Sequence, residues 1–400
     1  MTAAPTRAVL AALDAGGAEA RFVGGCVRDA VAGRPVRDID IATPAGPQRV
    51  VDLIEAAGLK AVPTGLAHGT ITAVAAHQPF EITTLREDVE TFGRHATVTF
   101  TDDWKADAAR RDFTMNALSC TPEGAVFDYF GGLEDLRAGR VRFVGQAAQR
   151  IAEDYLRLLR FFRFHAHYGR DAPDPEGLAA AAAAAPELIR LSQERVRAEL
   201  LRLLEAPDPV PTLDIMIAYR ILAEELPEEG DTRPLARLLT LESGPADALL
   251  RLAALVDTDR QGADAIAERL RLSNAETARL ELLTQPPLRV RPDMTGRELR
   301  VACYRLGKTA VADLLRLSAA RSGGTDSLAA ALVEAAAWPD LTFPVKGRDL
   351  IALGVDKGPP MGDLLSALEA WWIERDFRPD RAALLARAES LLPPGPSPSP

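Results

Sequence analysis

The sequence has few of the residues that build metal clusters, disulfide frameworks and membrane spans. Its 400 residues include three cysteines, Cys26, Cys120 and Cys303, and five histidines, none of them after residue 167. Cysteines this far apart fit neither a disulfide framework nor a zinc site, so we expect small buried side chains. No apolar run approaches the roughly 18 residues of a membrane helix, and charged residues interrupt the N-terminal stretch too early for a secretory signal. The sequence therefore predicts a cytoplasmic protein with no membrane segment.

The charge is negative overall but unevenly distributed. The net charge is −10, while apolar residues make up 47% and charged residues 26% of the sequence, as in an ordinary globular protein. Residues 137–170 contain eight arginines and two acids, and residues 286–321 contain eight lysines and arginines and three acids. The acidic total argues against indiscriminate coating of nucleic acid, whereas the two basic segments indicate local surfaces for anions.

The hydrophobic pattern changes near residue 137 from mixed strands and helices to helices alone. Short β-branched or aromatic segments predict strands at 20–23, 39–42, 70–75, 80–85 and 125–129. Helical patterns predict helices at 26–32, 47–57 and 112–118. We therefore predict an α+β fold in which a mixed-sheet head is followed by an all-helical remainder.

The length of the chain excludes a single small domain. We predict a head over residues 1–137, a helical neck over 138–205 and a helical body and tail over 206–392. Residues 393–400, PPGPSPSP, cannot continue a helix and are predicted to be a disordered tail.

A glycine pair joins a predicted strand to a predicted helix in the segment FVGGCVRD. Backbone N–H groups near Gly24 and Gly25 and the start of the helix face the same space, which suits a phosphate group. Arg28 lies one turn into the helix. A glycine pair alone is more typical of a tight turn, so the phosphate interpretation depends on the carboxylates that follow.

Asp38 and Asp40 follow shortly after, in the sequence DID. Alternate side chains of a strand share a face, so both aspartates are predicted to point one way while Ile39 and Ile41 point into the core. Two such carboxylates suit magnesium, which activates an attacking hydroxyl and neutralises a leaving pyrophosphate. The alternative is a solvated edge strand. Glu81, on the FEITTLR strand, is either a third carboxylate near the metal or a surface acid.

The segment RRDFTMNAL, residues 110–118, predicts a helix that Asp112 caps, with Asn116 one turn later. Arg111 lies just before this helix, where the helix dipole disfavours cations. Two adjacent arginines at such a place indicate an anion, and Arg111 could reach triphosphate or ribose oxygens.

The segment EDYLRLLRFFRF predicts a helix with an apolar stripe on one side and Asp154, Arg157, Arg160 and Arg163 on the exposed side. Asp154 and Arg157 are predicted to be neighbours. An ordinary surface ion pair is the alternative. Three successive arginines without balancing acids favour a binding role instead.

Eight motifs occur in an order that resembles one known family. They are GGCVRD, the DID strand, TGLAHGT, FEITTLRED, RRDFTMNAL, YFGGLEDL, EDYLRLLR and SQERVRAEL. This series resembles the class II tRNA nucleotidyltransferases, the CCA-adding enzymes, and their relatives the bacterial poly(A) polymerases. The resemblance covers residues 20–205, whereas the chain beyond residue 210 is similar only as generic helices. It implies a polymerase β-like nucleotidyltransferase head.

The resemblance also implies substrates, a cofactor and residue roles. The substrates are tRNA, CTP and ATP, and the cofactor is magnesium. Gly25 and Arg28 resemble triphosphate and ribose contacts, Asp38 and Asp40 the magnesium ligands, and Arg111 a nucleotide contact. Asp154, Arg157, Arg160 and Arg163 resemble the base-reading and nucleotide-binding set of the neck. Residues 87–109 resemble a flexible loop associated with adding the terminal A, and Glu194 and Arg195 a motif that braces the neck.

The base-reading role of an aspartate beside an arginine also follows from hydrogen-bond chemistry. Cytosine and adenine each present an exocyclic amine donor beside a ring-nitrogen acceptor, and uracil and guanine present a carbonyl acceptor beside a ring N–H. Asp154 only accepts and Arg157 only donates, so the pair accepts C and A and rejects U and G. No nucleic-acid template is required.

The sequence favours CCA addition over its alternatives. Some bacterial members carry a metal phosphohydrolase domain rich in His and Asp, and the lack of histidine after residue 167 indicates that this activity is absent. Poly(A) polymerases of the group differ around TGLAHGT and usually carry a strongly basic tail, whereas this chain has HGT and an acidic C-terminal half. The alternatives are poly(A) polymerase, a partial CC- or A-adding enzyme, and a non-catalytic RNA-binding protein. The sequence predicts neither the oligomeric state nor the tRNA contacts of the body and tail.

Overall fold

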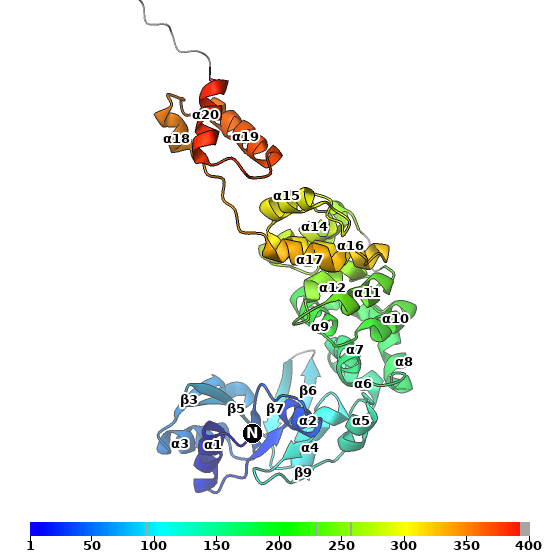
Figure 1. Cartoon of the computed structure of the whole chain (residues 1–400). Coiled ribbons are helices and arrows are strands. Elements are labelled where there is room, and N and C mark those ends of the chain that lie inside the picture. Colours follow the sequence, from blue (N-terminus) through cyan, green and yellow to red (C-terminus); the bar gives the residue numbers. More distant parts are fainter. Residues whose placement is uncertain (93–94, 229, 257, 393–400) are drawn as a thin grey trace, which may run out of the picture. The chain divides into compact units, whose positions relative to one another are not determined.

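The head is built on one seven-stranded mixed sheet (Figure 1). The computed structural model describes residues 1–92, 95–228, 230–256 and 258–392. The strands of the sheet are β1 Arg21–Val23, β2 Asp40–Thr43, β3 Lys60–Gly65, β4 Thr70–Ala75, β5 Gln78–Thr84, β8 Ser119–Cys120 and β9 Val126–Phe127. Their order is β3-β4-β5-β2-β1-β8-β9, in which β2 and β5 are parallel and the other neighbours antiparallel. The predicted mixed sheet is confirmed.

Two helices, α1 (Ala4–Ala15) and α3 (Pro47–Ala56), pack against each other and against β4 and β5. Side chains of β4 alternate between buried and half-buried, as a strand with one core-facing side requires. The centre of this core is fully buried and includes Leu13, Ile41, Ile54, Ile71 and Ile82. Burying each such side chain contributes about 1.5–3 kcal/mol. This core fixes β2 and β5, and with them Asp40 at the start of β2 and Glu81 within β5.

The segment predicted as a flexible loop, residues 87–109, contains a separate two-stranded antiparallel sheet and a helix. The strands are β6 (Arg86–Phe92) and β7 (His95–Phe100), and the helix is α4 (Trp104–Ala109). Residues 93 and 94 of this segment lie outside the described residues. The Asp103 side chain accepts a hydrogen bond from the Lys105 N–H and caps α4.

The helix predicted at 112–118 is wrong, because tertiary packing overrides the local pattern. Only Thr114–Asn116 form a short 3₁₀ turn, and Phe113 is extended, with φ −120° and ψ 149°. Phe113 forms a β-bridge to Phe143 and is fully buried, with the two ring centres 4.8 Å apart. The buried aromatic pair therefore holds this segment out of a helix.

The neck is helical, as predicted. Its helices are α5 Gly132–Ala138, α6 Ala147–Glu153, α7 Leu156–Tyr168, α8 Pro175–Ala184 and α9 Gln193–Leu204. One difference matters for the site: the helix predicted through Asp154 is interrupted there. Asp154 is extended, with φ −154° and ψ 106°, so α6 ends before it and α7 begins after it.

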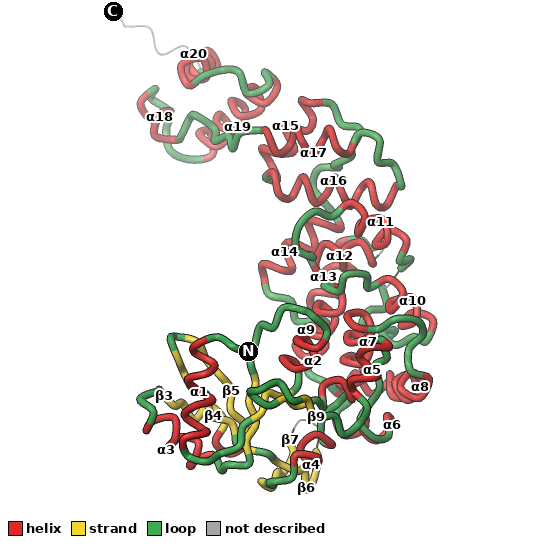
Figure 2. The backbone as a smooth tube through the Cα atoms, turned by 60° about the horizontal axis from the view of Figure 1, so that its bottom comes forward, coloured by secondary structure: helices red, strands yellow, loops and turns green. Residues whose placement is uncertain are grey.

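The described chain divides into two compact units, Met1–Thr232 with Ser243–Leu280, and Arg233–Glu242 with Glu281–Pro400. The remaining helices of the body are α10 Val210–Ala218, α11 Arg233–Leu241, α12 Ala248–Leu255, α13 Arg260–Arg269 and α14 Asn274–Thr284. Those further along are α15 Gly296–Leu306, α16 Lys308–Ser322, α17 Leu328–Ala337, α18 Gly347–Ala352, α19 Pro359–Glu374 and α20 Arg381–Leu391. Within the ranges that the structure describes, the last strand along the chain is β9, and the elements after it are helical (Figure 2). The predicted limits between head, neck and body stay predictions, and residues 393–400 lie outside the described residues.

In the second unit, α11 packs on α16, and α18, α19 and α20 share a small core around Trp372. The three cysteines are free and buried, as expected. No helix in the described ranges is long and apolar enough to cross a membrane.

Candidate active site

The glycine pair forms the turn between β1 and α2 (Gly25–Val31). Gly24 has φ +70° and ψ −129°, a conformation that glycine alone adopts readily, and its N–H donates to the Leu118 carbonyl at 3.1 Å. A Cβ atom at Gly24 would lie 2.7 Å from Nη1 of Arg111. A Cβ atom at Gly25 would meet nothing closer than Nη2 of Arg28, at 3.6 Å. The fold therefore requires Gly24, whereas Gly25 leaves open space beside a guanidinium group.

Two alanine substitutions separate the roles of these glycines. Gly24→Ala should destabilise the fold by about 1–3 kcal/mol, because its backbone conformation is strained for any other residue. Gly25→Ala should barely change the unfolding temperature but should weaken nucleotide binding, because its methyl group fills space open to a phosphate. Thermal unfolding and calorimetric titration with a nucleoside triphosphate measure the two effects. Equal nucleotide affinity in Gly25→Ala and the wild type would rule out a phosphate cradle.

Asp40 lies at the start of β2, beside Glu81 of the parallel strand β5. The strand register pairs these two residues directly. Asp38 precedes the strand, so the prediction that both aspartates lie on one strand was wrong. Ile41 is fully buried and Ile39 packs partly buried against the same core, as predicted.

The carboxyl group of Asp40 lies in a negative environment. Burial raises its pKa above the ordinary value, and the charges of Glu81 and Asp38 raise it further, while Arg111 opposes the rise. This excess of negative charge suits a divalent cation. Among the described residues, no three His, Cys, Asp or Glu side chains converge closely enough to enclose a metal by themselves. Asp38 and Asp40 would therefore hold the ion together with substrate phosphates.

The negative charges around Asp40 predict a change in folding stability that can be measured without catalysis. Because the pKa of Asp40 is raised by folding, its contribution to stability is present at low pH and is lost as the pH rises through that pKa. At neutral pH without divalent cation, Asp40→Asn should therefore raise the free energy of unfolding. In the presence of CTP, magnesium should stabilise the wild type more than the variant. Denaturant titrations with and without magnesium test this, and an equal magnesium effect on both proteins would exclude Asp40 as a ligand.

Arg28 is buried and joins the glycine turn to the neck. Its Nε and Nη2 donate to the two carboxylate oxygens of Asp29 at 2.9 Å, and its Nη1 donates to Oδ1 of Asn116 at 2.7 Å. The Tyr168 hydroxyl, at the end of α7, donates to Asp29 at 2.6 Å. The Arg28 guanidinium also lies 4.4 Å from the centre of the Tyr168 ring. These contacts fix the orientation of Arg28 beside the open space at Gly25.

Asp112 connects the head to α7. Its Oδ1 accepts from the Asn116 amide at 2.9 Å, and its Oδ2 accepts from Nε and Nη2 of Arg160 at 2.8 and 2.6 Å. Burial raises the pKa of the Asp112 carboxyl, but the Arg160 charge and the hydrogen bonds from Asn116, Arg160 and Phe113 outweigh burial and lower it. The predicted helix-capping role is thus wrong, and Asp112 is the ionised partner of Arg160 instead.

The three neck arginines predicted to contact the nucleotide are ion-paired. Arg157 Nη1 lies 2.5 Å from Oε2 of Glu153, and Arg163 Nε lies 2.5 Å from Oε2 of Glu199 on α9. Arg160 is paired with Asp112. The prediction of arginines without balancing acids was wrong, because two of the partners come from segments 36 and 48 residues away in the sequence.

Arg150, which sequence reasoning missed, ties the neck to Arg111. Its Nη1 donates to Glu153 at 2.6 Å, and its Nη2 donates to the Arg111 carbonyl at 2.6 Å. Arg111 in turn donates from Nη2 to Oδ2 of buried Asp107 at 3.3 Å. Glu153 thus links Arg157 to the backbone that carries Arg111. The one signal in the sequence was the spacing of Arg150, Glu153 and Arg157 by three and four residues.

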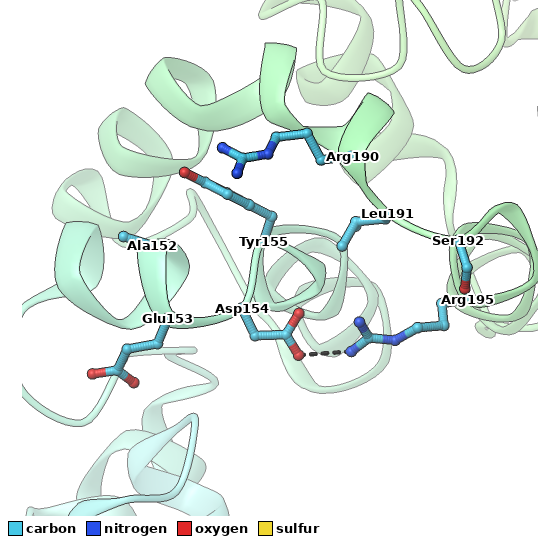
Figure 3. A pocket seen from close by; sticks show the side chains of 8 residues that line it. All are labelled: Ala152, Glu153, Asp154, Tyr155, Arg190, Leu191, Ser192 and Arg195. Carbon is cyan, nitrogen blue, oxygen red and sulfur yellow. Dashed lines mark hydrogen bonds and ion pairs between the residues drawn. The ribbon is translucent and has the colours of Figure 1, made fainter. Parts of the chain in front are cut away.

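Asp154 faces a pocket of about 450 Å³ between the α6–α7 break and the start of α9 (Figure 3). Its Oδ2 accepts from Nη2 of Arg195 at 2.7 Å and its Oδ1 accepts from the Leu156 N–H at 3.2 Å. Arg190 and Tyr155 line the same pocket. Asp154 is therefore ion-paired with Arg195 and not with Arg157, the surface pair given as the alternative, while the Arg157 N–H donates to the Asp154 carbonyl at 2.9 Å. The contact also shows Arg195 bracing the neck.

The predicted residues thus form two groups. The charges of Asp38 and Arg111 both act on Asp40, and Arg111 lies against the glycine turn that also carries Gly25. Asp154 and Arg157 lie at the α6–α7 break. Hydrogen bonds through Asn116, Asp112 and Arg150 connect the two groups, and these three residues are the ones that sequence reasoning assigned differently or missed.

Comparisons with known proteins place the chain in a family. The "Poly A polymerase head domain" model matches residues 20–142, and the "Probable RNA and SrmB- binding site of polymerase A" model matches residues 172–229. The mitochondrial CCA tRNA nucleotidyltransferase 1 of Homo sapiens is 36% identical, over 92% of this chain and 86% of that protein. The CCA-adding enzyme of Limosilactobacillus fermentum is 32% identical, over 97% of both chains.

A solved structure agrees with these relatives. The Bacillus stearothermophilus CCA-adding enzyme in complex with CTP has a TM-score of 0.78 and 28% identity, over 96% of this chain and 97% of that one. Identity above 30% across more than nine-tenths of the chain, with a shared fold, leaves one assignment. The chain belongs to the class II CCA tRNA nucleotidyltransferase and poly(A) polymerase family, and is a nucleotidyltransferase of the CCA-adding kind.

Proposed function

We propose that the chain adds C, C and A in turn to the 3′ end of tRNA from CTP and ATP, without a template, releasing pyrophosphate at each step. The observation that carries this proposal is the convergence of Asp38, Asp40 and Arg111 at the glycine turn, connected by hydrogen bonds to a neck that carries Asp154 and Arg157. The relatives named above carry CCA addition in their names.

Each candidate residue then has one task. Gly25 leaves room for phosphate oxygens, and Arg28 and Arg111 bring positive charge beside that room. Asp38 and Asp40 would hold magnesium, which would supply activation of the RNA 3′-hydroxyl and charge neutralisation of the leaving pyrophosphate. Asp154 and Arg157 read the pairing edge of the incoming base. Arg160 and Arg163 are ion-paired, so we assign them to positioning the nucleotide site.

The hydrogen-bonding capacity of Asp154 and Arg157 supports this role. A carboxylate offers about four lone-pair sites, and Asp154 uses two of them, so it can still accept from an exocyclic amine. Arg157 uses Nη1 for Glu153 and for the Arg150 carbonyl. Among the described residues, its Nε and Nη2 make no hydrogen bond, so they can donate to a ring nitrogen.

One assay separates CCA addition from the alternatives. A tRNA transcript that ends before CCA is incubated with CTP alone, with ATP alone and with both, with magnesium or with a chelator. We expect CTP alone to add C and C, both nucleotides to add CCA, and the chelator to stop all addition. Tracts of A from ATP alone would indicate a poly(A) polymerase, growth that stops after CC with both nucleotides a partial enzyme, and no growth a non-catalytic RNA-binding protein.

The basic segment 286–321 is a weaker candidate for tRNA contact than its charge indicated. Arg300 forms a two-bonded ion pair with Asp376 at 2.8 Å, and Arg291 is paired with Asp293 at 3.0 Å. Charge reversal at Arg300 would break a structural contact, so only exposed arginines such as Arg289 and Arg297 are suitable probes of RNA binding. The cytoplasmic location stays a prediction that cell fractionation tests.

A further inference from the structure

A second pocket in the first unit lies at the far end of α2 from the glycine turn. Its volume is about 470 Å³, and its lining includes Arg34, Arg137, Arg170, His167 and Tyr168. Arg34 follows α2, Arg137 lies in the last turn of α5, and Arg170 follows α7. Three arginines from three segments thus meet at one hollow.

These three arginines differ from the other arginines of the neck. Within residues 137–170, Arg140 and Arg142 pair with Asp135, Arg150 and Arg157 with Glu153, Arg160 with Asp112, and Arg163 with Glu199. Arg137 and Arg170 are the two of this segment that make no ion pair within the described chain, and Arg34 makes none there either. All three are exposed. The excess positive charge of the basic segment therefore gathers at this pocket.

The contacts of these side chains leave donors free. Arg34 donates from Nη2 to the His167 carbonyl at 2.6 Å and lies 4.1 Å from the centre of the Tyr168 ring. Arg170 donates from Nη1 to the Arg137 carbonyl at 3.1 Å. Both bonds are to uncharged carbonyls, so the guanidinium charges are not neutralised. His167 adds no charge, because burial and nearby Arg163 and Arg34 lower its pKa, despite the Arg202 carbonyl and Glu205, which raise it.

We propose that this pocket binds a phosphodiester group of the RNA substrate, upstream of the 3′ end. Guanidinium groups bind phosphate oxygens through paired N–H donors, and no carboxylate lines the pocket to oppose them. This inference rests on the proposed function, which identifies the RNA as tRNA.

The distance along α2 favours the RNA strand over a free nucleotide. The seven residues of α2 span about 10 Å at 1.5 Å per residue. Phosphates recur about every 3.4 Å along the axis of a DNA strand, so an RNA strand of similar rise that ran from the active site along α2 would bring a phosphate a few nucleotides upstream of its 3′ end near the pocket. The pocket thus lies a helix length away from the glycine turn at which we propose that the triphosphate binds.

The test is Arg137→Gln in the full-length protein. The Arg137 side chain makes no hydrogen bond or ion pair in the described ranges, so its removal should not disturb the fold, which the unfolding temperature checks. Affinity for tRNA lacking CCA is measured by fluorescence anisotropy at several salt concentrations, without nucleotide. The matched control is Arg7→Gln, which removes an exposed arginine from α1 with the same change of charge.

Arg137→Gln should weaken tRNA binding and reduce the slope of log affinity against log salt concentration by about 1. The triple variant Arg34→Gln/Arg137→Gln/Arg170→Gln should reduce both the affinity and the slope further. Arg7→Gln should change neither. CTP affinity, measured by calorimetry, should be unchanged in every variant. An unchanged salt slope in Arg137→Gln and the folded triple variant, or a loss of CTP affinity without loss of RNA affinity, would overturn the proposal. These binding measurements do not require turnover. A failure of the wild type to add CCA would therefore count against the proposed function and not against this pocket.

Discussion

Asp38→Ala and Asp40→Ala should each lower the rate of nucleotide addition on the order of 10³-fold or more. A catalytic metal contributes several kcal/mol to stabilising the transferring charge, and each 1.4 kcal/mol is tenfold in rate. Asp40 begins β2 on a buried core, and Asp38 is close enough to raise its pKa, so either loss removes a carboxylate that balances the cation. Single-turnover addition of CTP to a tRNA transcript, at saturating protein, measures the chemical step.

Binding of tRNA should be nearly unchanged in the same variants, because it depends on basic surfaces and not on these carboxylates. The matched control is Glu55→Ala, an exposed acid on α3 whose loss should leave the rate unchanged. Near-normal turnover by Asp38→Ala or Asp40→Ala would show that the metal site is elsewhere.

Asp154→Ala and Arg157→Ala should reduce discrimination against U and G by about 1–3 kcal/mol, the range of a good base-edge contact. Asp154 presents its carboxylate to the pocket of Figure 3 and keeps free acceptor sites, while Arg157 is anchored by Glu153 and keeps free donors. Loss of the acceptor removes a contact to the amine of both C and A, and loss of the donor removes one to their ring nitrogen. Both C and A incorporation should therefore fall relative to U and G. Initial rates with each of the four triphosphates measure this.

Metal dependence should not change in these neck variants, because the metal ligands lie on the head. Arg190→Ala is the control, since Arg190 lines the same pocket but its exposed side chain is paired with Glu187. Unchanged selectivity in Asp154→Ala and Arg157→Ala, with lower stability alone, would reduce both residues to structural ion pairs with Arg195 and Glu153.

The local pattern of the sequence predicted the elements whose packing is also local. The strand at Thr70–Ala75 and the helix from Pro47 occur as predicted, because alternation and amphipathic spacing match the faces that meet the core. The helix at 112–118 was wrong because Phe113 pairs with Phe143, thirty residues later in the chain. Asp154 was placed inside a helix because its neighbours are strong helix formers, whereas its side chain bonds Arg195 from α9. Such long-range contacts leave no periodic signal.

The same limit applies to charge. Counting arginines in the neck indicated a uniformly basic surface, but Asp112 and Glu199 neutralise two of them from other segments. The residues of the candidate site were recognisable from motif resemblance, while the bonds that orient them, through Asn116 and Arg150, were not. Arg34, Arg137 and Arg170, which make no ion pair among the described residues, line a different pocket.

Competition among all four nucleotides tests the central claim most directly. A tRNA transcript lacking CCA is incubated with the wild-type protein, magnesium and equal concentrations of ATP, CTP, GTP and UTP, and the 3′ ends are sequenced. We expect nearly all extended molecules to end in CCA and to grow no further; the proposed base-reading role of Asp154 and Arg157 accounts for the restriction to C and A. Ends that contain U or G, or long tracts of A, would contradict it.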